Sequence, residues 1–301
     1  MAEIGRLLTA MCTPFTEDGK VSYEAAQKLA RLLVADGSDG IVVAGTTGES
    51  PTLSDDEKIE LFRAVKEAIP GHQVVAGTGT NDTRHSVEMS ERAMHAGADA
   101  LLAVVPYYNK PTQEGMFQHF KAVSAAGPVI MYNIQSRTGT NMSAQTTVRC
   151  AQLTGVIGVK EASGNIEQMG LVCGGAPEGF RVWSGDDGFT LPLLAVGGYG
   201  VIAVTSHLAG SAFKAMIDAH LEGRNQVASH LHQRLLPLIG TLMTAASNPI
   251  PVKTALNQLG FPAGPFRLPL TPMDDATTQK VMAAVQAAGD LVTFKPRVEV
   301  A

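Results

Sequence analysis

Short apolar runs alternate with amphipathic stretches along the first three quarters of the chain. The runs are rich in Val, Ile, Leu and Ala on both faces, a pattern typical of strands buried in a parallel sheet. Eight such strands are predicted: Leu7–Phe15, Gly40–Ala44, Gln73–Gly77, Ala100–Val105, Pro128–Asn133, Val156–Glu161, Phe180–Ser184 and Val201–Thr205.

A segment with the spacing of an amphipathic helix follows each strand. Ser22 is the predicted N-cap of the first helix, which runs to about Leu33. Ser54 and Glu57 form a predicted capping box at the start of the second. The remaining helices are predicted over Thr83–His95, Gln113–Ser124, Ser143–Leu153, Ile166–Cys173, Phe189–Val196 and Ser211–Leu221.

Eight strand–helix units predict an α/β fold, a (β/α)8 TIM barrel, as the catalytic domain over residues 1–224. A doubly wound open sheet is the alternative, but no G-x-G-x-x-G follows the first strand. Residues 225–301 are predicted to form an appended C-terminal helical region. Its helices are expected over Val227–Met243, Val252–Leu259 and Ala276–Ala288.

Composition argues against several classes of protein. The 301 residues carry a net charge of −5 with dispersed basic residues, so we expect no nucleic-acid partner. No apolar run approaches the roughly 18 residues of a membrane span, and Met1–Arg6 does not resemble a signal peptide. Three cysteines, Cys12, Cys150 and Cys173, form no CxxC motif, which favours a reducing compartment. The predicted location is the cytoplasm.

The strand candidate Val156–Glu161 contains one lysine, Lys160. Burial disfavours the charged ammonium, so the pKa of Lys160 should fall and a neutral, nucleophilic amine should become accessible. A lysine of this kind forms a Schiff base with a carbonyl substrate. Alternatively, the lysine packs its stem and extends its ammonium to solvent, or pairs with Glu161.

Polar residues follow other strands at the edge where barrel enzymes place their sites. Thr46 and Thr47 lie in a loop with two glycines, which either holds an anion on free backbone N–H groups or is only a tight turn. Tyr107 and Tyr108 lie in a proline-bounded loop, where packing or interface roles are the commoner alternative to acid–base chemistry.

The fifth and seventh strands end in further candidates. Tyr132 can relay protons through the steps of imine formation. The planar guanidinium of Arg137 can bind a carboxylate through two N–H groups. Alternatively, Arg137 forms only a surface ion pair. Asp186 is either a helix N-cap or a reacting group. The histidines show no metal-ligand spacing, and His230 and His232 are two residues apart on a helix, so no metal site is expected.

Together these residues predict imine chemistry on an α-keto acid. The keto carbon would bond to Lys160, and the substrate carboxylate would rest on the loop of Thr46 and Thr47. The imine would then act as the electron sink that makes the neighbouring carbon an enamine nucleophile.

With these residues assembled, the chain resembles the dihydrodipicolinate synthase family of the pyruvate-dependent class I aldolase superfamily, from about Leu7 to Asp290. The motifs that carry the resemblance are Gly45–Ser50, Pro106–Gly115, Tyr132–Asn133 with Ser136–Gly139, Gly158–Gly164, Ser184–Asp187 and Asn248–Lys253. The first and fourth mark the superfamily. The Tyr-Tyr-Asn and Ser-Arg-Thr-Gly motifs are more particular to the synthase.

The resemblance implies a lyase in which Lys160 forms a Schiff base with pyruvate. It implies that Thr46 and Thr47 meet the pyruvate carboxylate, and that Ile202 and Gly185 border the substrate. Tyr132, Thr46 and Tyr108 would form a proton relay, with Tyr108 reaching in from a neighbouring subunit. Arg137 would hold the carboxylate of L-aspartate 4-semialdehyde.

The resemblance also implies a place in metabolism and an assembly. The product is the cyclic precursor in the diaminopimelate route to lysine. No cofactor is needed, and the usual assembly is a homotetramer, a dimer of dimers.

Two departures from the family pattern matter. Gln135 stands where the family has a proline before the serine of the Arg137 loop. Ser50, Asn81 and Tyr107 match the site where many members bind lysine as an inhibitor. Asp55, Lys58 and His85, however, stand where sensitive enzymes have histidines and a glutamate. Weak or absent lysine feedback is therefore expected.

Two other functions stay open at this stage. N-acetylneuraminate lyase and the keto-deoxy-sugar-acid aldolases share the lysine, the tyrosine and the glycine-rich loop. Arg137 favours a short aldehyde with a carboxylate over a polyhydroxylated sugar. A non-catalytic barrel used for binding or regulation would be expected to lack Lys160, Tyr132 or Thr46, and all three are present.

Overall fold

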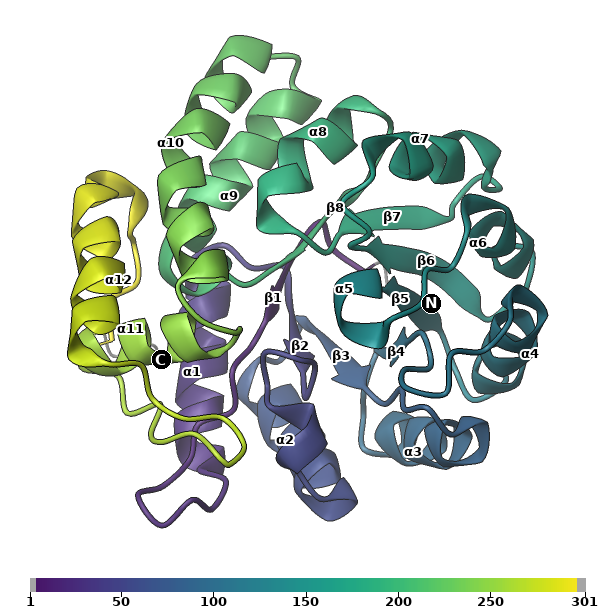
Figure 1. Cartoon of the computed structure of the whole chain (residues 1–301), viewed down its shortest axis with the longest axis horizontal. Coiled ribbons are helices and arrows are strands. Elements are labelled where there is room, and N and C mark those ends of the chain that lie inside the picture. The colour runs from purple at the N-terminus through teal and green to yellow at the C-terminus, as the bar shows by residue number, and fades with distance from the viewer. Residues whose placement is uncertain (1–3, 297–301) are drawn as a thin grey trace.

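The computed structural model describes residues 4–296, and within them eight parallel strands close into a barrel (Figure 1). Each strand pairs with the next, and β8 pairs with β1. The strands are β1 (Leu7–Ala10), β2 (Gly40–Val43), β3 (Gln73–Gly77), β4 (Ala100–Val104), β5 (Val129–Asn133), β6 (Val156–Glu161), β7 (Arg181–Ser184) and β8 (Gly200–Ala203). The predicted TIM barrel is confirmed.

Helices surround this barrel as a ring (Figure 1). They are α1 (Tyr23–Ala35), α2 (Asp55–Ala68), α3 (Thr83–His95), α4 (Gln113–Val123), α6 (Ala144–Cys150), α7 (Ile166–Gly175), α8 (Thr190–Ala195) and α9 (Ser206–Leu221). The one-turn helix α5 (Gln135–Thr138) lies over the end of β5 rather than in the ring.

Side chains pack in two separate apolar clusters because strand residues point alternately inward and outward. The larger cluster fills the space between strands and helices. The smaller one fills the barrel interior and includes Leu8, Val42, Tyr132, Trp183 and Ile202. Each strand thus carries apolar residues on both faces, which is the physical reason for the continuous apolar runs in the sequence.

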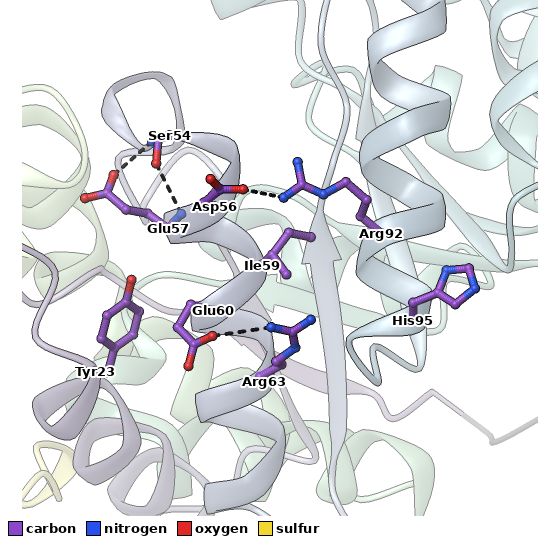
Figure 2. A pocket seen from close by; sticks show the side chains of 9 residues that line it. All are labelled: Tyr23, Ser54, Asp56, Glu57, Ile59, Glu60, Arg63, Arg92 and His95. Carbon is purple, nitrogen blue, oxygen red and sulfur yellow. Dashed lines mark hydrogen bonds and ion pairs between the residues drawn. The ribbon is translucent and has the colours of Figure 1, made fainter.

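The predicted capping box at the start of α2 is present (Figure 2). The backbone N–H of Glu57 donates to Ser54 Oγ at 3.2 Å, and the Ser54 N–H donates to Glu57 Oε2 at 2.9 Å. Ser22 caps α1 in the predicted way by accepting a hydrogen bond from the N–H of Ala25. Local side-chain chemistry therefore fixes where these helices begin.

The predicted C-terminal helices are α10 (Asn225–Thr244), α11 (Ile250–Gln258) and α12 (Asp275–Ala287). α10 lies beside α9, and α11 and α12 lie outside the ring on the same side (Figure 1). Asn248, Lys253 and Arg267 reach from this region to the barrel loops. The division into segments 1–224 and 225–301 stays a prediction, and residues 1–3 and 297–301 lie outside the described residues.

Several predicted boundaries are wrong, among them the following three. β1 ends at Ala10 rather than at Phe15, and β8 ends at Ala203 rather than at Thr205. α9 begins at Ser206 instead of Ser211, with a kink at Ala209. The kink interrupts the helical spacing where Gly210 packs against Asp36, since a Cβ on Gly210 would lie 2.6 Å from the Asp36 carbonyl oxygen.

Candidate active site

Lys160 and Tyr132 are direct neighbours at the carboxyl ends of β6 and β5. Tyr132 belongs to the interior cluster, and Lys160 is in register with both Tyr132 and Trp183, so it faces the barrel interior as they do. Lys160 Nζ lies 4.3 Å from the centroid of the Tyr132 ring. Both side chains are 5% exposed. The predicted amine and phenol therefore meet within the barrel.

The environment of Lys160 favours its neutral form. Burial lowers the pKa of Lys160 from 10.5 to about 8; the negative charge of Asp187 opposes this effect and the positive charge of Arg137 adds to it. Glu161, the alternative partner, instead accepts hydrogen bonds from Asn133 Nδ2 and from the Ser163 N–H. An ion pair between Lys160 and Glu161 is thus excluded, and so is an ammonium extended to solvent.

Tyr132 is a proton donor at neutral pH. Burial raises its pKa to about 12, partly offset by the positive charge of Arg137 and by a hydrogen bond with Thr46. The phenol therefore keeps its proton, with Thr46 as its hydrogen-bond partner and the Lys160 amine over its ring. This arrangement suits a group that passes protons to and from the oxygen lost during imine formation.

The loop Gly45–Ser50 presents two free backbone donors. Gly48, Glu49 and Ser50 donate their N–H groups to the carbonyl oxygens of Gly45 and Thr46 inside the loop. None of the residues 4–296 accepts a hydrogen bond from the N–H of Thr46 or Thr47. Two adjacent N–H groups of this kind are suited to a carboxylate, so the anion-holding role is favoured over a turn that serves geometry alone.

Asn248 ties this loop to the Arg137 segment. Its Nδ2 donates to Thr47 Oγ1 at 3.0 Å, and its carbonyl oxygen accepts a hydrogen bond from the Arg137 guanidinium at 3.3 Å. The one-turn helix α5 positions Arg137, whose N–H donates to the Ile134 carbonyl. Within residues 4–296 Arg137 forms no ion pair, so the surface ion pair considered above is absent, and Arg137 is among the residues that line the cavity described below.

A cavity of about 270 Å³ lies over this end of the barrel. Five predicted site residues line it: Thr46, Ser50, Tyr107, Tyr132 and Arg137. A larger hollow of about 580 Å³ between α1, α2 and α3 contains none of them (Figure 2). Its charged side chains already pair, Asp56 with Arg92 and Glu60 with Arg63. The smaller cavity is therefore the candidate site.

The other predicted residues, Lys160 and Thr47 among them, are not part of the cavity lining. Gly185 packs against Lys160, because a Cβ there would lie 3.1 Å from Lys160 Cγ and Cε. Ile202 is buried in the barrel interior. Tyr108 is 89% exposed, and it does not reach the cavity of its own chain. Asn81 is also outside the cavity lining and accepts a hydrogen bond from Asn109 through its carbonyl oxygen.

Sequence reasoning missed the roles of two buried acids. Asp187 is fully buried, and its carboxylate accepts hydrogen bonds from the N–H groups of Val204 and Thr205 at the end of β8. Glu49 pairs with Lys253 at 2.8 Å with neither side chain exposed. The only signal in the sequence that could have indicated buried roles for these two acids is that they lie in the loops after strands. Asp186, by contrast, is the N-cap considered above and accepts from the Gly188 N–H.

Within residues 4–296, no group of three or more His, Cys, Asp or Glu side chains is arranged to hold a metal ion. Those residues also include no helix long and apolar enough to cross a membrane.

We predict that imine formation depends on pH through Lys160. The fraction of neutral amine increases as pH rises through about 8, so the single-turnover rate of adduct formation with an α-keto acid should increase as pH rises toward 8 and level off at higher pH. Rates of borohydride-trapped adduct formation between pH 6 and 10 measure this profile. Asp187→Asn removes a negative charge and should shift the midpoint to lower pH. A midpoint near 10.5 in the unsubstituted protein would contradict the prediction.

Comparisons with known proteins show what the whole chain is similar to. The model of the dihydrodipicolinate synthetase family matches residues 3–288. The 4-hydroxy-tetrahydrodipicolinate synthase of Moorella thermoacetica is 54% identical, over 95% of this chain and 98% of that protein. The counterpart from Symbiobacterium thermophilum is 49% identical, over 97% and 100%.

Solved structures show the same fold. The crystal structure of DHDPS from Cyanidioschyzon merolae with lysine bound superposes with a TM-score of 0.93 at 44% identity, covering 95% of this chain and 98% of that chain. The chloride-inhibited dihydrodipicolinate synthase from Acinetobacter baumannii, complexed with pyruvate, gives a TM-score of 0.91 at 36% identity, covering 95% and 99%.

Proposed function

Because the chain belongs to the dihydrodipicolinate synthetase family, we propose that it condenses pyruvate with L-aspartate 4-semialdehyde as a 4-hydroxy-tetrahydrodipicolinate synthase. The observation that carries the proposal is the buried Lys160 beside Tyr132, next to a loop with two free N–H groups. The relatives that bear this name are similar to the chain over nearly its whole length.

In the proposed reaction, the neutral Lys160 amine attacks the keto carbon of pyruvate. Tyr132 supplies the proton with which the keto oxygen leaves as water, and the imine forms. The N–H groups of Thr46 and Thr47 hold the pyruvate carboxylate. Loss of a methyl proton gives an enamine, which attacks the aldehyde carbon of the second substrate. The amine of that substrate then closes the ring onto the imine carbon and releases Lys160.

Arg137 is proposed to bind the carboxylate of L-aspartate 4-semialdehyde. It lies on the cavity, forms no ion pair within residues 4–296, and presents two N–H donors in one plane. Tyr108 is proposed to complete the proton relay from a neighbouring subunit, since it is exposed and does not line the cavity of its own chain. The assembly proposed for this arrangement is a homotetramer built as a dimer of dimers. Ile202 and Gly185 are proposed to border the substrate.

The proposed location is the cytoplasm. Cys12, Cys150 and Cys173 are all free thiols, which suits a reducing compartment.

Two measurements test the function together. Intact mass after borohydride treatment with pyruvate detects an adduct on Lys160, and a condensation assay with L-aspartate 4-semialdehyde detects turnover. An adduct with rapid condensation supports the synthase. An adduct without condensation would keep the imine chemistry but require another aldehyde, such as a sugar acid. Absence of an adduct would overturn the proposal.

We predict that Arg137→Ala chiefly impairs use of the aldehyde. Loss of a bidentate carboxylate partner costs about 2–3 kcal/mol, which corresponds to roughly a 30- to 150-fold higher KM for L-aspartate 4-semialdehyde. Borohydride trapping with pyruvate should persist, because Thr46 and Thr47 hold that carboxylate. Steady-state kinetics with each substrate varied in turn distinguish the two effects. An equal loss of trapping and of aldehyde use would argue against this assignment.

We also predict weak or absent inhibition by lysine. The three matching residues, Ser50, Asn81 and Tyr107, remain the proposed allosteric set, and Ser50 and Tyr107 line the cavity. Lys58 lines it too and would repel the amines of the inhibitor, while Asp55 is already paired with His85 at 2.8 Å. Steady-state rates over a lysine titration measure the effect. Full inhibition below millimolar lysine would contradict the prediction.

A further inference from the structure

Asn248 contacts the glycine-rich loop through its side chain and the Arg137 segment through its backbone. Its Nδ2 donates to Thr47 Oγ1 at 3.0 Å, and its carbonyl oxygen accepts from the Arg137 guanidinium at 3.3 Å. Its Oδ1 is buried and accepts no hydrogen bond within residues 4–296. A substitution at position 248 therefore acts on Thr47 and leaves the backbone contact with Arg137 in place.

The direction of the hydrogen bond between Asn248 and Thr47 decides what the Thr47 hydroxyl can do. A hydroxyl group carries one proton to donate and accepts through its oxygen. Because Thr47 Oγ1 accepts from Asn248, its own proton is not used in that contact. Thr47 is 2% exposed, and none of residues 4–296 accepts a hydrogen bond from its hydroxyl. A buried donor needs an acceptor, so this proton is available to a ligand that supplies one.

Helix α11 fixes the place of Asn248 beside the loop. The helix begins at Ile250, two residues after Asn248. Its Lys253 pairs with Glu49 at 2.8 Å, and neither of these two side chains is exposed. Glu49 follows Thr47 by two residues in the same loop. The loop is thus held at two points by one short segment, which gives Asn248 the rigid support that a residue orienting its neighbour requires.

We propose that Asn248 is a positioning residue, whose amide N–H donates to Thr47 Oγ1 and so directs the Thr47 hydroxyl proton to the carboxylate of the α-keto acid. Thr47 then offers that carboxylate its hydroxyl as well as its free backbone N–H. The inference rests on the proposed function and deepens it, because it assigns the orientation of a substrate-binding group to a residue outside the barrel.

The proposal requires an amide at position 248. A carboxylate has no N–H group and only accepts hydrogen bonds. Aspartate at this position would therefore accept the Thr47 proton itself and would place a negative charge near the carboxylate of the substrate. Alanine would remove the contact but leave the Thr47 proton free.

Borohydride trapping over a range of pyruvate concentrations tests the proposal. It gives the half-saturating pyruvate concentration for wild type, Asn248→Asp and Asn248→Ala. The matched control Asn225→Asp introduces the same charge at an exposed position at the start of α10. The condensation assay gives the KM for L-aspartate 4-semialdehyde in the same proteins.

Asn248→Asp should raise the half-saturating pyruvate concentration about tenfold or more, because a hydrogen bond to a charged group is lost and a like charge is gained. Asn248→Ala should raise it less, and Asn225→Asp should leave it unchanged. The KM for the aldehyde should stay close to that of wild type, because the carbonyl oxygen of residue 248 still accepts from Arg137. If Asn248 only filled space, Asp would replace it better than Ala, since Asn and Asp have nearly the same shape.

Thr47→Val provides a second measurement that does not depend on Asn248→Asp folding. It removes the hydroxyl, so adding Asn248→Ala to Thr47→Val should raise the half-saturating pyruvate concentration little further. Additive losses in this double variant would overturn the proposal. A wild-type response of Asn248→Asp, or a larger loss in Asn248→Ala than in Asn248→Asp, would also overturn it while the proposed function stands. Absence of an adduct in wild type would overturn the proposed function and this inference together.

Discussion

Lys160→Ala is expected to abolish the pyruvate adduct and to lower kcat for condensation by on the order of 10³-fold or more. The variant lacks the only nucleophile that the proposed reaction uses, and the barrel interior offers no other amine beside Tyr132 among the described residues. Intact mass after borohydride treatment measures the adduct, and the condensation assay measures the rate.

Two variants make this result specific. Lys121→Ala changes an exposed lysine and should form the adduct as wild type does. Tyr132→Phe keeps the amine but removes the proton donor, so trapping should persist at a reduced rate. A pyruvate adduct of undiminished yield in Lys160→Ala would show that another lysine is the nucleophile.

Lys253→Met is expected to destabilise the protein by about 3–5 kcal/mol, because it leaves the carboxylate of Glu49 buried without its cation. Lys253 Nζ lies 2.8 Å from Glu49 Oε1, and neither side chain is exposed. The Phe15 ring, 4.1 Å from the ammonium, adds to the apolar surroundings. Urea unfolding of wild type and variant at equal protein concentration measures the change.

The double variant Glu49→Gln/Lys253→Met provides the control for this prediction. It removes both charges, so most of the lost stability should return. The Arg267 N–H can still donate to the amide oxygen at position 49. A change of less than about 1 kcal/mol in the free energy of unfolding of Lys253→Met would contradict the prediction that Glu49 needs its buried cation.

The barrel was predictable because its strands are buried on two sides. Apolar residues on both faces distinguish such strands from surface strands without any knowledge of their neighbours. Ser54 and Glu57 were equally readable, since a capping box depends on residues three apart. The barrel and the start of α2 follow from local patterns.

Features that depend on distant residues were not predictable. Helix α5 is a single turn with Arg137 in it, and four residues carry no helical period. In the sequence, Lys253 is an ordinary basic residue on an amphipathic helix. Its ion pair with Glu49, 204 positions earlier, exists only in the folded chain. The predicted start of α9 was wrong because the helix is kinked at Ala209, next to Gly210, whose N–H donates to the Asp36 carboxylate at the end of α1. The sequence around Ala209 does not reveal this distant partner.

Lys160 and Tyr132 were predictable as a pair for a different reason. Each lies near the end of an apolar run, and a parallel barrel brings all such ends to one rim. Tyr108 and Asn81 show the limit of this reasoning, because loops beyond the rim follow no period.

Gly185 has a consequence for the entropy of the reaction. A free lysine side chain loses up to about 2 kcal/mol of rotamer entropy when it is fixed in one arrangement. Here the stem of Lys160 is already confined between Gly185 and the Tyr132 ring. That loss is incurred when the protein folds, so the proposed imine formation does not incur it again. Gly185→Ala should displace the aliphatic part of the Lys160 side chain and so slow imine formation. Each 1.4 kcal/mol that the displacement adds to the barrier corresponds to about a tenfold lower rate.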